Sequence, residues 1–364
     1  MSFLDYLVIS LYTFALLLIF FFALSEFLLM RKYLRYKKTK GKDTSNPNYF
    51  QQGYPTVTIQ LPIYNELYVV DKLLDNIAEI DYPHEALEIQ VLDDSTDETY
   101  DLIAKKVQEL QNNGLPIQHI HRTNRTGFKA GALKEGLEIA KGDYIAIFDA
   151  DFLPDPSWLK QTLPYFSTKN IGAVQTKWGH LNRDYSFLTK VQAFALDIHF
   201  TMEQVGRYAG GHFINFNGTA GIWRKDCILD AGNWRALSLT EDLDLSYRAQ
   251  LKGWKMVYLE QVETPAELPV DITAAKSQQF RWNKGGAENL RLHLYDLILL
   301  RCISITANSS YFSMYSCGVC FCAQALKASV NNVIKIAVRI CSENHSKVGG
   351  ALLLPYSFYT LIYN

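Results

Sequence analysis

Short apolar stretches typical of β-strands alternate with helical stretches from Pro55 onward, and this alternation limits the possible folds more than any other feature. The strand-like stretches are VTIQLPI at 57–63, LEIQVL at 87–92, YIAIF at 144–148 and IGAVQT at 171–176. Apolar residues at helical spacing lie between the first two strands, and Ser95 and Glu98 suggest a capping box for the next helix. Strands joined through helices predict a mostly parallel α/β sheet with helices on both faces.

Polar residues follow three of these strands at the point where each strand ends. The first strand runs into PIYNE, the second into DDSTD and the third into DAD. The carboxyl ends of parallel strands meet at one edge of a sheet, and ligands of such sheets bind beyond that edge. The three loops are therefore expected to line one crevice.

Asp149 and Asp151, in the third of these loops, are candidate metal ligands. Their spacing places both carboxylates on one side of an extended chain. Mg²⁺ or Mn²⁺ bridging to a diphosphate is the usual partner of such a pair, because these ions take oxygen ligands and keep positions open for phosphate. A polar turn after a strand is the alternative explanation. Asp93 and Asp94 at the end of the neighbouring strand favour the metal site.

The segment HRTNRTGFKAGALKEG at 121–136 places basic residues and glycines at the start of a helix. Backbone N–H groups and the helix dipole favour an anion there, so Lys129 is a candidate ligand of a diphosphate. A solvated basic loop is the alternative interpretation. The position of the loop beside the acidic edge favours the diphosphate.

A further helix is expected over 238–254, capped by Thr240 and ended by Gly253. Glu241 and Asp242 fall in its first turn, where acidic residues are favourable for electrostatic reasons alone. In the catalytic interpretation, a carboxylate here accepts the proton of an acceptor hydroxyl. The helix dipole is then expected to hold the carboxyl pKa low and the group ionised at neutral pH.

The stretch QQFRW presents an amide, a cation and an indole on one helical face, from Gln278, Arg281 and Trp282. A flat indole with a polar edge suits the face of a sugar ring, and an amide offers both a donor and an acceptor. An interfacial helix with its Trp and Arg at the level of lipid headgroups is the alternative. Both interpretations can hold together.

Residues 7–30 are almost free of charge and long enough for a bilayer-crossing helix. Asp5 precedes them and a basic cluster follows at 31–42, whereas a cleaved signal peptide carries its basic residues first. The positive-inside rule keeps that cluster, and the domain after it, in the cytosol. The expected organisation is a transmembrane helix at 1–30, a basic cytosolic linker at 31–54, an α/β domain at 55–298 and a C-terminal region at 299–364.

The net charge limits the classes of binding partner, and the cysteine content indicates the redox state of the cellular compartment. With 36 Lys and Arg against 37 Asp and Glu, the formal net charge of −1 gives no global field that would attract nucleic acid. Cys227 is the only cysteine before residue 300, so the middle of the chain has no disulfide framework, in agreement with a reducing compartment. The C-x-x-C at 317–320 stands among apolar residues and indicates small buried side chains rather than zinc.

The order of these motifs, together with FNGTAGIWR at 216–224, resembles the membrane-bound family-2 glycosyltransferases of the cellulose synthase superfamily. The resemblance covers roughly residues 50–290 and is strongest to the cellulose synthase-like branch that makes β-1,4-mannan, glucomannan or xyloglucan backbones. It implies a GT-A fold and inverting transfer of a hexose from GDP-mannose or UDP-glucose to the 4-hydroxyl of a growing β-1,4-glycan.

The resemblance also implies roles for individual residues. Asp242, with Glu241, would be catalytic, and Asp149 and Asp151 would hold Mg²⁺ or Mn²⁺. The residues expected on the donor are Tyr64, Glu66, Asp93, Asp94, Lys129, Asp149, Gln278 and Arg281. The residues expected on the acceptor are Phe216, Asn217, Gly218, Thr219 and Trp282.

The chain departs from the family pattern after residue 300. The family has several membrane helices there, but no run in this sequence reaches the roughly 18 uncharged apolar residues of a convincing span. We expect an irregular membrane-associated region, and a truncated chain is one interpretation of it. Two alternative functions stay open: a single-addition transferase on a lipid acceptor such as ceramide, and an inactive membrane scaffold. The expected membrane is the plasma membrane in a bacterium and the Golgi in a plant.

Overall fold

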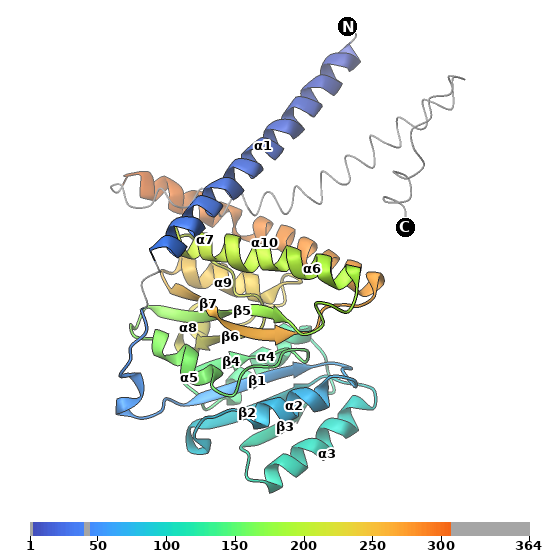
Figure 1. Cartoon of the computed structure of the whole chain (residues 1–364), viewed down its shortest axis with the longest axis vertical. Coiled ribbons are helices and arrows are strands. Elements are labelled where there is room, and N and C mark those ends of the chain that lie inside the picture. The colour runs from blue at the N-terminus through green and yellow to red at the C-terminus, as the bar shows by residue number, and fades with distance from the viewer. Residues whose placement is uncertain (1–2, 40–43, 307–364) are drawn as a thin grey trace, which may run out of the picture.

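The structure is a computed structural model, described here for residues 3–39 and 44–306 (Figure 1). A seven-stranded sheet forms the centre of this part of the chain, in the order β3-β2-β1-β4-β6-β5-β7. Its strands are β1 (Val57–Ile63), β2 (Leu87–Asp93), β3 (Ile117–His121), β4 (Tyr144–Ile147), β5 (Ile171–His180), β6 (Gly221–Arg224) and β7 (Lys255–Ala266).

The sheet is mostly parallel, as predicted. The parallel pairs are β1 with β2, β1 with β4, β2 with β3, and β5 with β7. Strand β6 runs antiparallel to both of its neighbours, β4 and β5. The four predicted strands are β1, β2, β4 and β5. The prediction missed β3, β6 and β7: β3 carries two histidines, β6 is four residues long, and β7 contains polar residues throughout.

Helices cover both faces of the sheet (Figure 1). One face packs against α2 and α3, where residues 57, 59, 61 and 63 of β1 join the apolar core, and the other packs against α4, α8 and α9. The α-helices are α1 (Phe3–Lys38), α2 (Val70–Ala78), α3 (Thr99–Asn112), α4 (Phe128–Ile139), α5 (Trp158–Thr162), α6 (Phe187–Ile198), α7 (Gln204–Ala209), α8 (Lys225–Asp230), α9 (Glu241–Leu251) and α10 (Ile272–Thr306). The shorter turns are 3₁₀ at Tyr49–Gln52, His84–Ala86 and Leu163–Tyr165, and π at His199–Glu203.

Helix α1 is long and apolar enough to cross a membrane. It continues to Lys38, so the first part of the segment expected as a linker is helical. Two tyrosines of this last portion, Tyr33 and Tyr36, pack against the core, and Lys37 Nζ lies 3.0 Å from Glu260 Oε1. The end of α1 therefore rests on the domain instead of acting as a free tether.

Two predicted helix caps are wrong. Ser95 and Glu98 form no capping box: α3 begins at Thr99, and the Ser95 hydroxyl instead accepts from the backbone N–H of Asn65 at 3.0 Å. Thr240 does occupy the N-cap position of α9, but its side chain makes no cap hydrogen bond. The Thr240 hydroxyl is engaged by Asn289 of α10, at 2.9 Å from Nδ2.

The structure describes the predicted C-terminal region, 299–364, only as far as residue 306. Residues 299–306 are the last turns of α10, and the remainder lies outside the described residues, together with the C-x-x-C at 317–320.

Candidate active site

A cavity of about 810 Å³ opens beyond the carboxyl ends of β1 and β4. Its walls come from the loops after these strands, the starts of α4 and α9, the end of β5 and one face of α10. The predicted site residues that line it are Tyr64, Glu66, Asp94, Lys129, Asp149, Asp151, Asn217, Gly218, Glu241, Asp242, Gln278, Arg281 and Trp282. Segments more than 200 residues apart in sequence thus share one cavity.

Lys129 connects three of these segments. Its ammonium lies 2.5 Å from Asp149 Oδ1, donates to the carbonyl of Gly218 at 3.0 Å and lies 3.9 Å from Glu241 Oε1. Burial opposes a charge here, but the carboxylates of Asp149 and Glu241 outweigh it and raise the pKa of Lys129. The lysine therefore stays cationic, and an anionic ligand near it would compete with Asp149 for the ammonium.

Gly218 separates the Lys129 ammonium from Asp242. The glycine has φ +78°, and a Cβ at this position would lie 3.3 Å from Asp242 Oδ2 and 3.5 Å from Lys129 Nζ. Only glycine adopts this backbone without strain while leaving that space open. The loop at 217–218 thereby brings a carboxylate and an ammonium to the same side of the cavity.

Asp242 has an environment different from the one predicted. Burial, followed by the charge of Glu241, raises the pKa of Asp242 to about 8, and burial also raises the pKa of Glu241. The expectation that the helix dipole holds this pKa low is wrong, because two carboxyls side by side in a buried position outweigh the dipole. A pKa near neutrality is a property of many general bases.

The carboxylates of the D-x-D loop fit a divalent cation. Burial, with a contribution from Asp149, raises the pKa of Asp151 to about 7. The cavity lining contains eight acidic residues against three basic ones, namely Arg125, Lys129 and Arg281. Such an excess of carboxylate oxygens is the donor set that Mg²⁺ and Mn²⁺ prefer, and Asp149 and Asp151 are the residues that could hold the ion.

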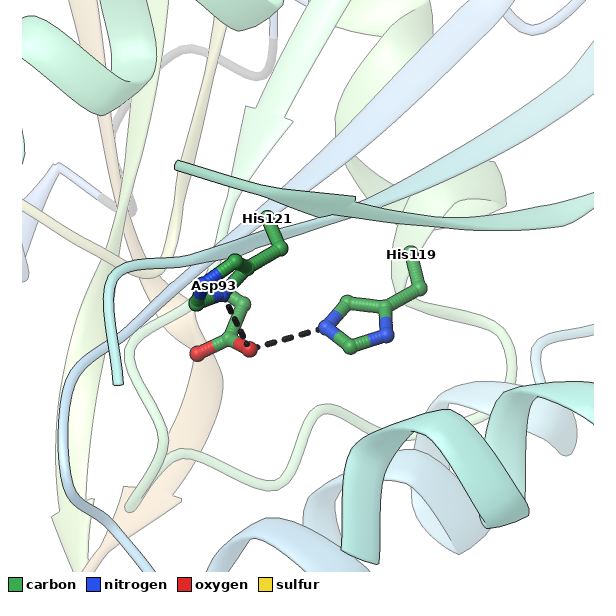
Figure 2. A group of neighbouring side chains, drawn as sticks. All are labelled: Asp93, His119 and His121. Carbon is green, nitrogen blue, oxygen red and sulfur yellow. Dashed lines mark hydrogen bonds and ion pairs between the residues drawn. The ribbon is translucent and has the colours of Figure 1, made fainter. Parts of the chain in front are cut away.

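Asp93 and Asp94 are adjacent in sequence but point into different surroundings. The Asp93 side chain is fully buried away from the cavity, where Oδ2 lies 2.8 Å from His119 Nε2 and 3.2 Å from His121 Nδ1 (Figure 2). The predicted donor contact therefore does not fit Asp93. Alternation along β2 explains the difference, because consecutive side chains of a strand face opposite sides of a sheet.

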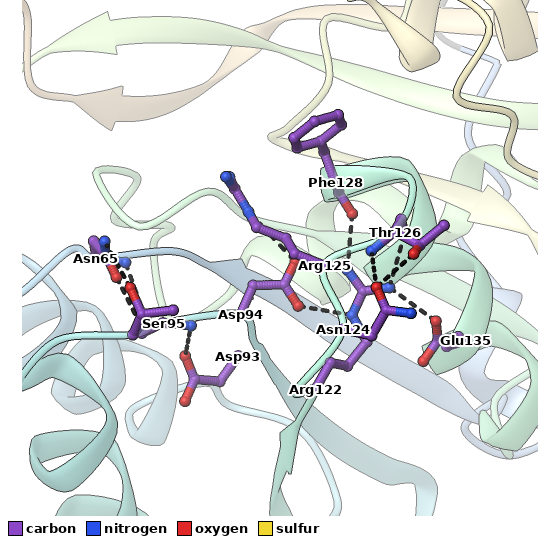
Figure 3. A network of polar contacts seen from close by, with 11 residues as sticks. Asn65, Asp93, Asp94, Ser95, Arg122, Asn124, Arg125, Thr126, Phe128 and Glu135 are labelled. Atoms are coloured by element: carbon purple, nitrogen blue, oxygen red, sulfur yellow. Dashed lines mark hydrogen bonds and ion pairs between the residues drawn. The ribbon is translucent and has the colours of Figure 1, made fainter.

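Asp94 anchors the loop that leads into α4. Arg122 binds its carboxylate through two hydrogen bonds of 2.7 and 2.6 Å and donates to the carbonyl of Phe128 at 3.0 Å (Figure 3). A bidentate pair of this kind fixes both direction and distance. Arg125 then lies with its guanidinium carbon 3.2 Å from the centre of the Tyr64 ring, which completes this wall of the cavity.

Two residues of the predicted acceptor loop do not reach the cavity. Phe216 is fully buried and packs against Trp223, with ring centres 5.2 Å apart. Thr219 is also fully buried, and its hydroxyl accepts from the backbone N–H of Asp149 at 2.8 Å. The prediction of direct acceptor contact is wrong for these two side chains. Thr219 instead helps to position the D-x-D loop.

Helix α10 is fastened to the start of α9. The fully buried Asn289 donates to Ser238 Oγ and Thr240 Oγ1, each at 2.9 Å, and Glu288 accepts from the backbone N–H of Leu239 at 2.9 Å. A Cβ on Gly285 would lie only 2.5 Å from Thr240 Oγ1, so the two helices approach closely there. These contacts hold α10 at the cavity that Gln278, Arg281 and Trp282 share with Asp242, and no pattern in the sequence indicated them.

Trp178 is a cavity residue that the sequence analysis missed. Its ring centre lies 6.2 Å from that of Trp282, and both indoles line the cavity. The predicted strand stopped at residue 176, whereas β5 continues to His180. The alternation of β5, extended by two residues, would have placed Trp178 on the face of Thr176 and near the crevice.

The sheet, the acidic D-x-D loop and a cavity beyond the strand ends define the GT-A class of fold. Residues 55–285 match the family described as glycosyltransferase like family 2, and the chain belongs to this family. The similar solved structures include the mannosyltransferase PcManGT from Pyrobaculum calidifontis in complex with GDP-Man and Mn2+. It shares the fold with a TM-score of 0.61 at 20% identity, over 96% of this chain and 94% of that one.

Plant sequences are more similar. The chain is 40% identical over 268 residues to probable glucomannan 4-beta-mannosyltransferase 7 of Oryza sativa subsp. japonica, covering 72% of this chain and 46% of the rice protein. It is also 40% identical over 251 residues to glucomannan 4-beta-mannosyltransferase 2 of Arabidopsis thaliana, covering 68% of this chain and 47% of that protein. The chain spans about half the length of the curated relatives it matches.

Proposed function

We propose that the protein transfers a hexose from a nucleotide-diphosphate sugar to the 4-hydroxyl of a β-1,4-glycan, with inversion at the anomeric carbon. The observation that carries the proposal is that the Asp242 carboxylate and the Lys129–Asp149 pair both lie next to Gly218 within one cavity. In a single displacement a base acts on the attacking oxygen while cations act on the departing diphosphate. The cavity lining supplies a candidate for each role, Asp242 as the base and Lys129 as a cation.

The donor would lie across the carboxyl ends of β1 and β4. Tyr64 and Asp94 line the side of the cavity suited to the nucleoside. Lys129 and Arg281 supply the cations that an anionic diphosphate requires, and the bound metal ion would neutralise further phosphate charge as the diphosphate leaves. Burial and the charge of Asp149 raise the pKa of Glu66, and the nearby charge of Arg281 opposes this rise.

Asp242 is the proposed general base. It would accept the proton of the acceptor 4-hydroxyl while that oxygen attacks the anomeric carbon, and Glu241 beside it raises its proton affinity. Arg281 and Lys129 would stabilise the negative charge that develops on the departing diphosphate. Because the displacement is single, an α-linked donor gives a β-linkage.

The acceptor would bind against the indoles of Trp282 and Trp178. Their adjacent rings form an apolar surface inside an otherwise acidic cavity, which suits the apolar face of a sugar ring. Asn217 and Gly218 lie on the Asp242 side, where the reacting hydroxyl must sit. The names of the plant relatives support mannose as the first sugar to test, with glucose as the alternative.

We further propose that α1 anchors the domain to a membrane and that the domain lies on the cytosolic side of it. The apolar stretch of α1 is followed by its basic end at Arg35, Lys37 and Lys38, in accord with the positive-inside rule. Helix α6 lies on the α1 side of the sheet (Figure 1) and exposes four apolar side chains at helical spacing: Phe187, Val191, Phe194 and Ile198. An apolar stripe of this kind suits contact with lipids. Glycans found at Asn124 or Asn217 would overturn the cytosolic placement.

The test is an assay of donor and product with the full chain in membranes. GDP-mannose and UDP-glucose are supplied separately with Mg²⁺ or Mn²⁺, and both nucleotide release and product length are measured. Long β-1,4 product that requires the ion supports the proposal. A single sugar on a lipid acceptor would favour the ceramide-type alternative, which the apolar stripe of α6 motivates. No nucleotide release with either donor would favour the inactive scaffold.

A further inference from the structure

The side chains of Asp93, His119 and His121 form a cluster on the side of the sheet that α3 covers (Figure 2). His119 and His121 alternate along β3 and therefore share one face, and Asp93 of β2 is paired directly with His121 in the parallel register. All three groups stand on regular strands rather than on loops. The cluster plays no part in the proposed transfer reaction.

We propose that Asp93, His119 and His121 bind one divalent cation of the zinc class, at a site separate from the D-x-D loop. One atom from each side chain faces the same point, and the three atoms lie within 4.8 Å of one another. Two of the separations are known: 2.8 Å from His119 Nε2 to Asp93 Oδ2, and 3.2 Å from His121 Nδ1 to the same oxygen. Tetrahedral Zn²⁺ with bonds of about 2.0 Å separates its ligand atoms by about 3.3 Å, so small movements suffice.

The surroundings of Asp93 orient its carboxylate so that Oδ2 is available to bind an ion. The other oxygen, Oδ1, accepts from the backbone N–H of Ser95 at 2.8 Å, which fixes the carboxylate plane (Figure 3). Oδ2 is thereby left directed at the imidazoles (Figure 2). Partners of this kind orient metal ligands in characterised sites. Asp93 itself is fully buried, and a buried carboxylate is stabilised by a cation.

An ion can reach the cluster from solvent. Strand β3 is the edge of the sheet, and the His121 side chain is 30% exposed. The ring of Tyr100, at the start of α3, lies 5.2 Å from the His119 ring and 4.6 Å from the His121 ring and covers one side. With three protein ligands, water would supply the fourth position.

The ligand types determine which ion is expected. Two imidazoles with one carboxylate suit Zn²⁺, Co²⁺ or Ni²⁺, whereas Mg²⁺ and Mn²⁺ prefer oxygen ligands such as those of the D-x-D loop. The two sites would therefore select different ions. Bound at the cluster, the ion would tie the edge strand β3 to β2 and to the loop at Ser95.

The experiment uses the full chain in detergent, freed of metal with a chelator and carrying Asp149→Asn and Asp151→Asn to remove the second site. Zn²⁺ is titrated by calorimetry, and Co²⁺ by its visible absorption, which reports imidazole coordination. We expect one equivalent to bind, and His119→Ala with His121→Ala to weaken binding at least about 100-fold. The matched control is His84→Ala, because His84 is an exposed histidine of another element, and it should leave binding unchanged.

The effect of Zn²⁺ on thermal stability is a second, independent measurement of binding. Zn²⁺ should raise the melting temperature of the parent and of His84→Ala but not that of the double histidine variant, because only a folded site binds the ion. If the double variant does not fold, His121→Asn alone is measured, since that side chain is partly exposed. Zinc binding that survives these substitutions, or the absence of binding above that of the double variant, would overturn the proposal.

Discussion

Replacing Asp242 by Asn should lower activity by orders of magnitude and yet stabilise the protein. The pKa of Asp242 is raised from its usual 3.8 to about 8, so the folded protein binds this proton more tightly than the unfolded chain does. The tighter proton binding of Asp242 therefore stabilises the folded protein fully below pH 3.8, and this stabilisation is lost as the pH rises toward 8. At pH 7 this loss of stability has an upper limit of about 4 kcal/mol at 1.36 kcal/mol per pH unit.

The amide keeps the shape of the carboxyl and carries no charge. The free energy of unfolding of the Asn variant should therefore exceed that of the parent at pH 7, by up to that amount. The assay is chemical unfolding in detergent, without metal or donor, at pH 7 and again near pH 4, where the gain should disappear. Turnover should fall about 10²–10⁴-fold, as for the loss of a general base. A variant that is no more stable than the parent at pH 7 would refute the burial argument, and one with normal turnover would remove Asp242 as the base.

Three further perturbations test other parts of the structure. Lys129→Ala should lower kcat/KM for the donor by about 10²-fold or more in nucleotide-release kinetics, and an unchanged value would exclude its role at the diphosphate. Phe216→Ala should cost about 3–5 kcal/mol of unfolding free energy and leave the acceptor KM unchanged, whereas an altered KM at full stability would restore the acceptor contact. Asp244 is held ionised by His293 and Arg248 although burial opposes it, and its pKa is lowered. Its stabilisation is present above pH about 4 and declines as the pH falls toward the lowered pKa, so Asp244→Asn should be less stable by about 3–5 kcal/mol at pH 7 and by a smaller amount at pH 3, as followed by unfolding at both pH values.

The parts of the fold that the sequence predicted are those with strong local patterns. The apolar runs of β1, β2 and β4 were recognised as strands, and helical connections between them predict a mostly parallel sheet. β3 escaped prediction because its exposed edge position permits polar residues such as Gln118 and His119, which break the apolar run. The end of β5 was missed because Lys177 interrupts its apolar run.

The candidate site shows a similar division. Residues placed directly by a strand end or a helix start, such as Asp149 and Lys129, could be located from the sequence. Phe216 could not, because the motif around it does not reveal which side chains of a loop turn inward. The fastening of α10 to α9 by Asn289 depends on tertiary contact between segments about 50 residues apart, which no local pattern encodes.

The charge of the cavity bears on the order in which ligands bind. A donor diphosphate brings further negative charge into a cavity with eight acidic and three basic lining residues, and Lys129 is already occupied by Asp149. We therefore expect donor affinity to depend strongly on the divalent cation. By thermodynamic linkage the donor must strengthen cation binding by the same factor. Metal affinity measured with and without the donor should consequently differ by as much as donor affinity measured with and without metal, and equal metal affinities would show that the protein's own cations suffice.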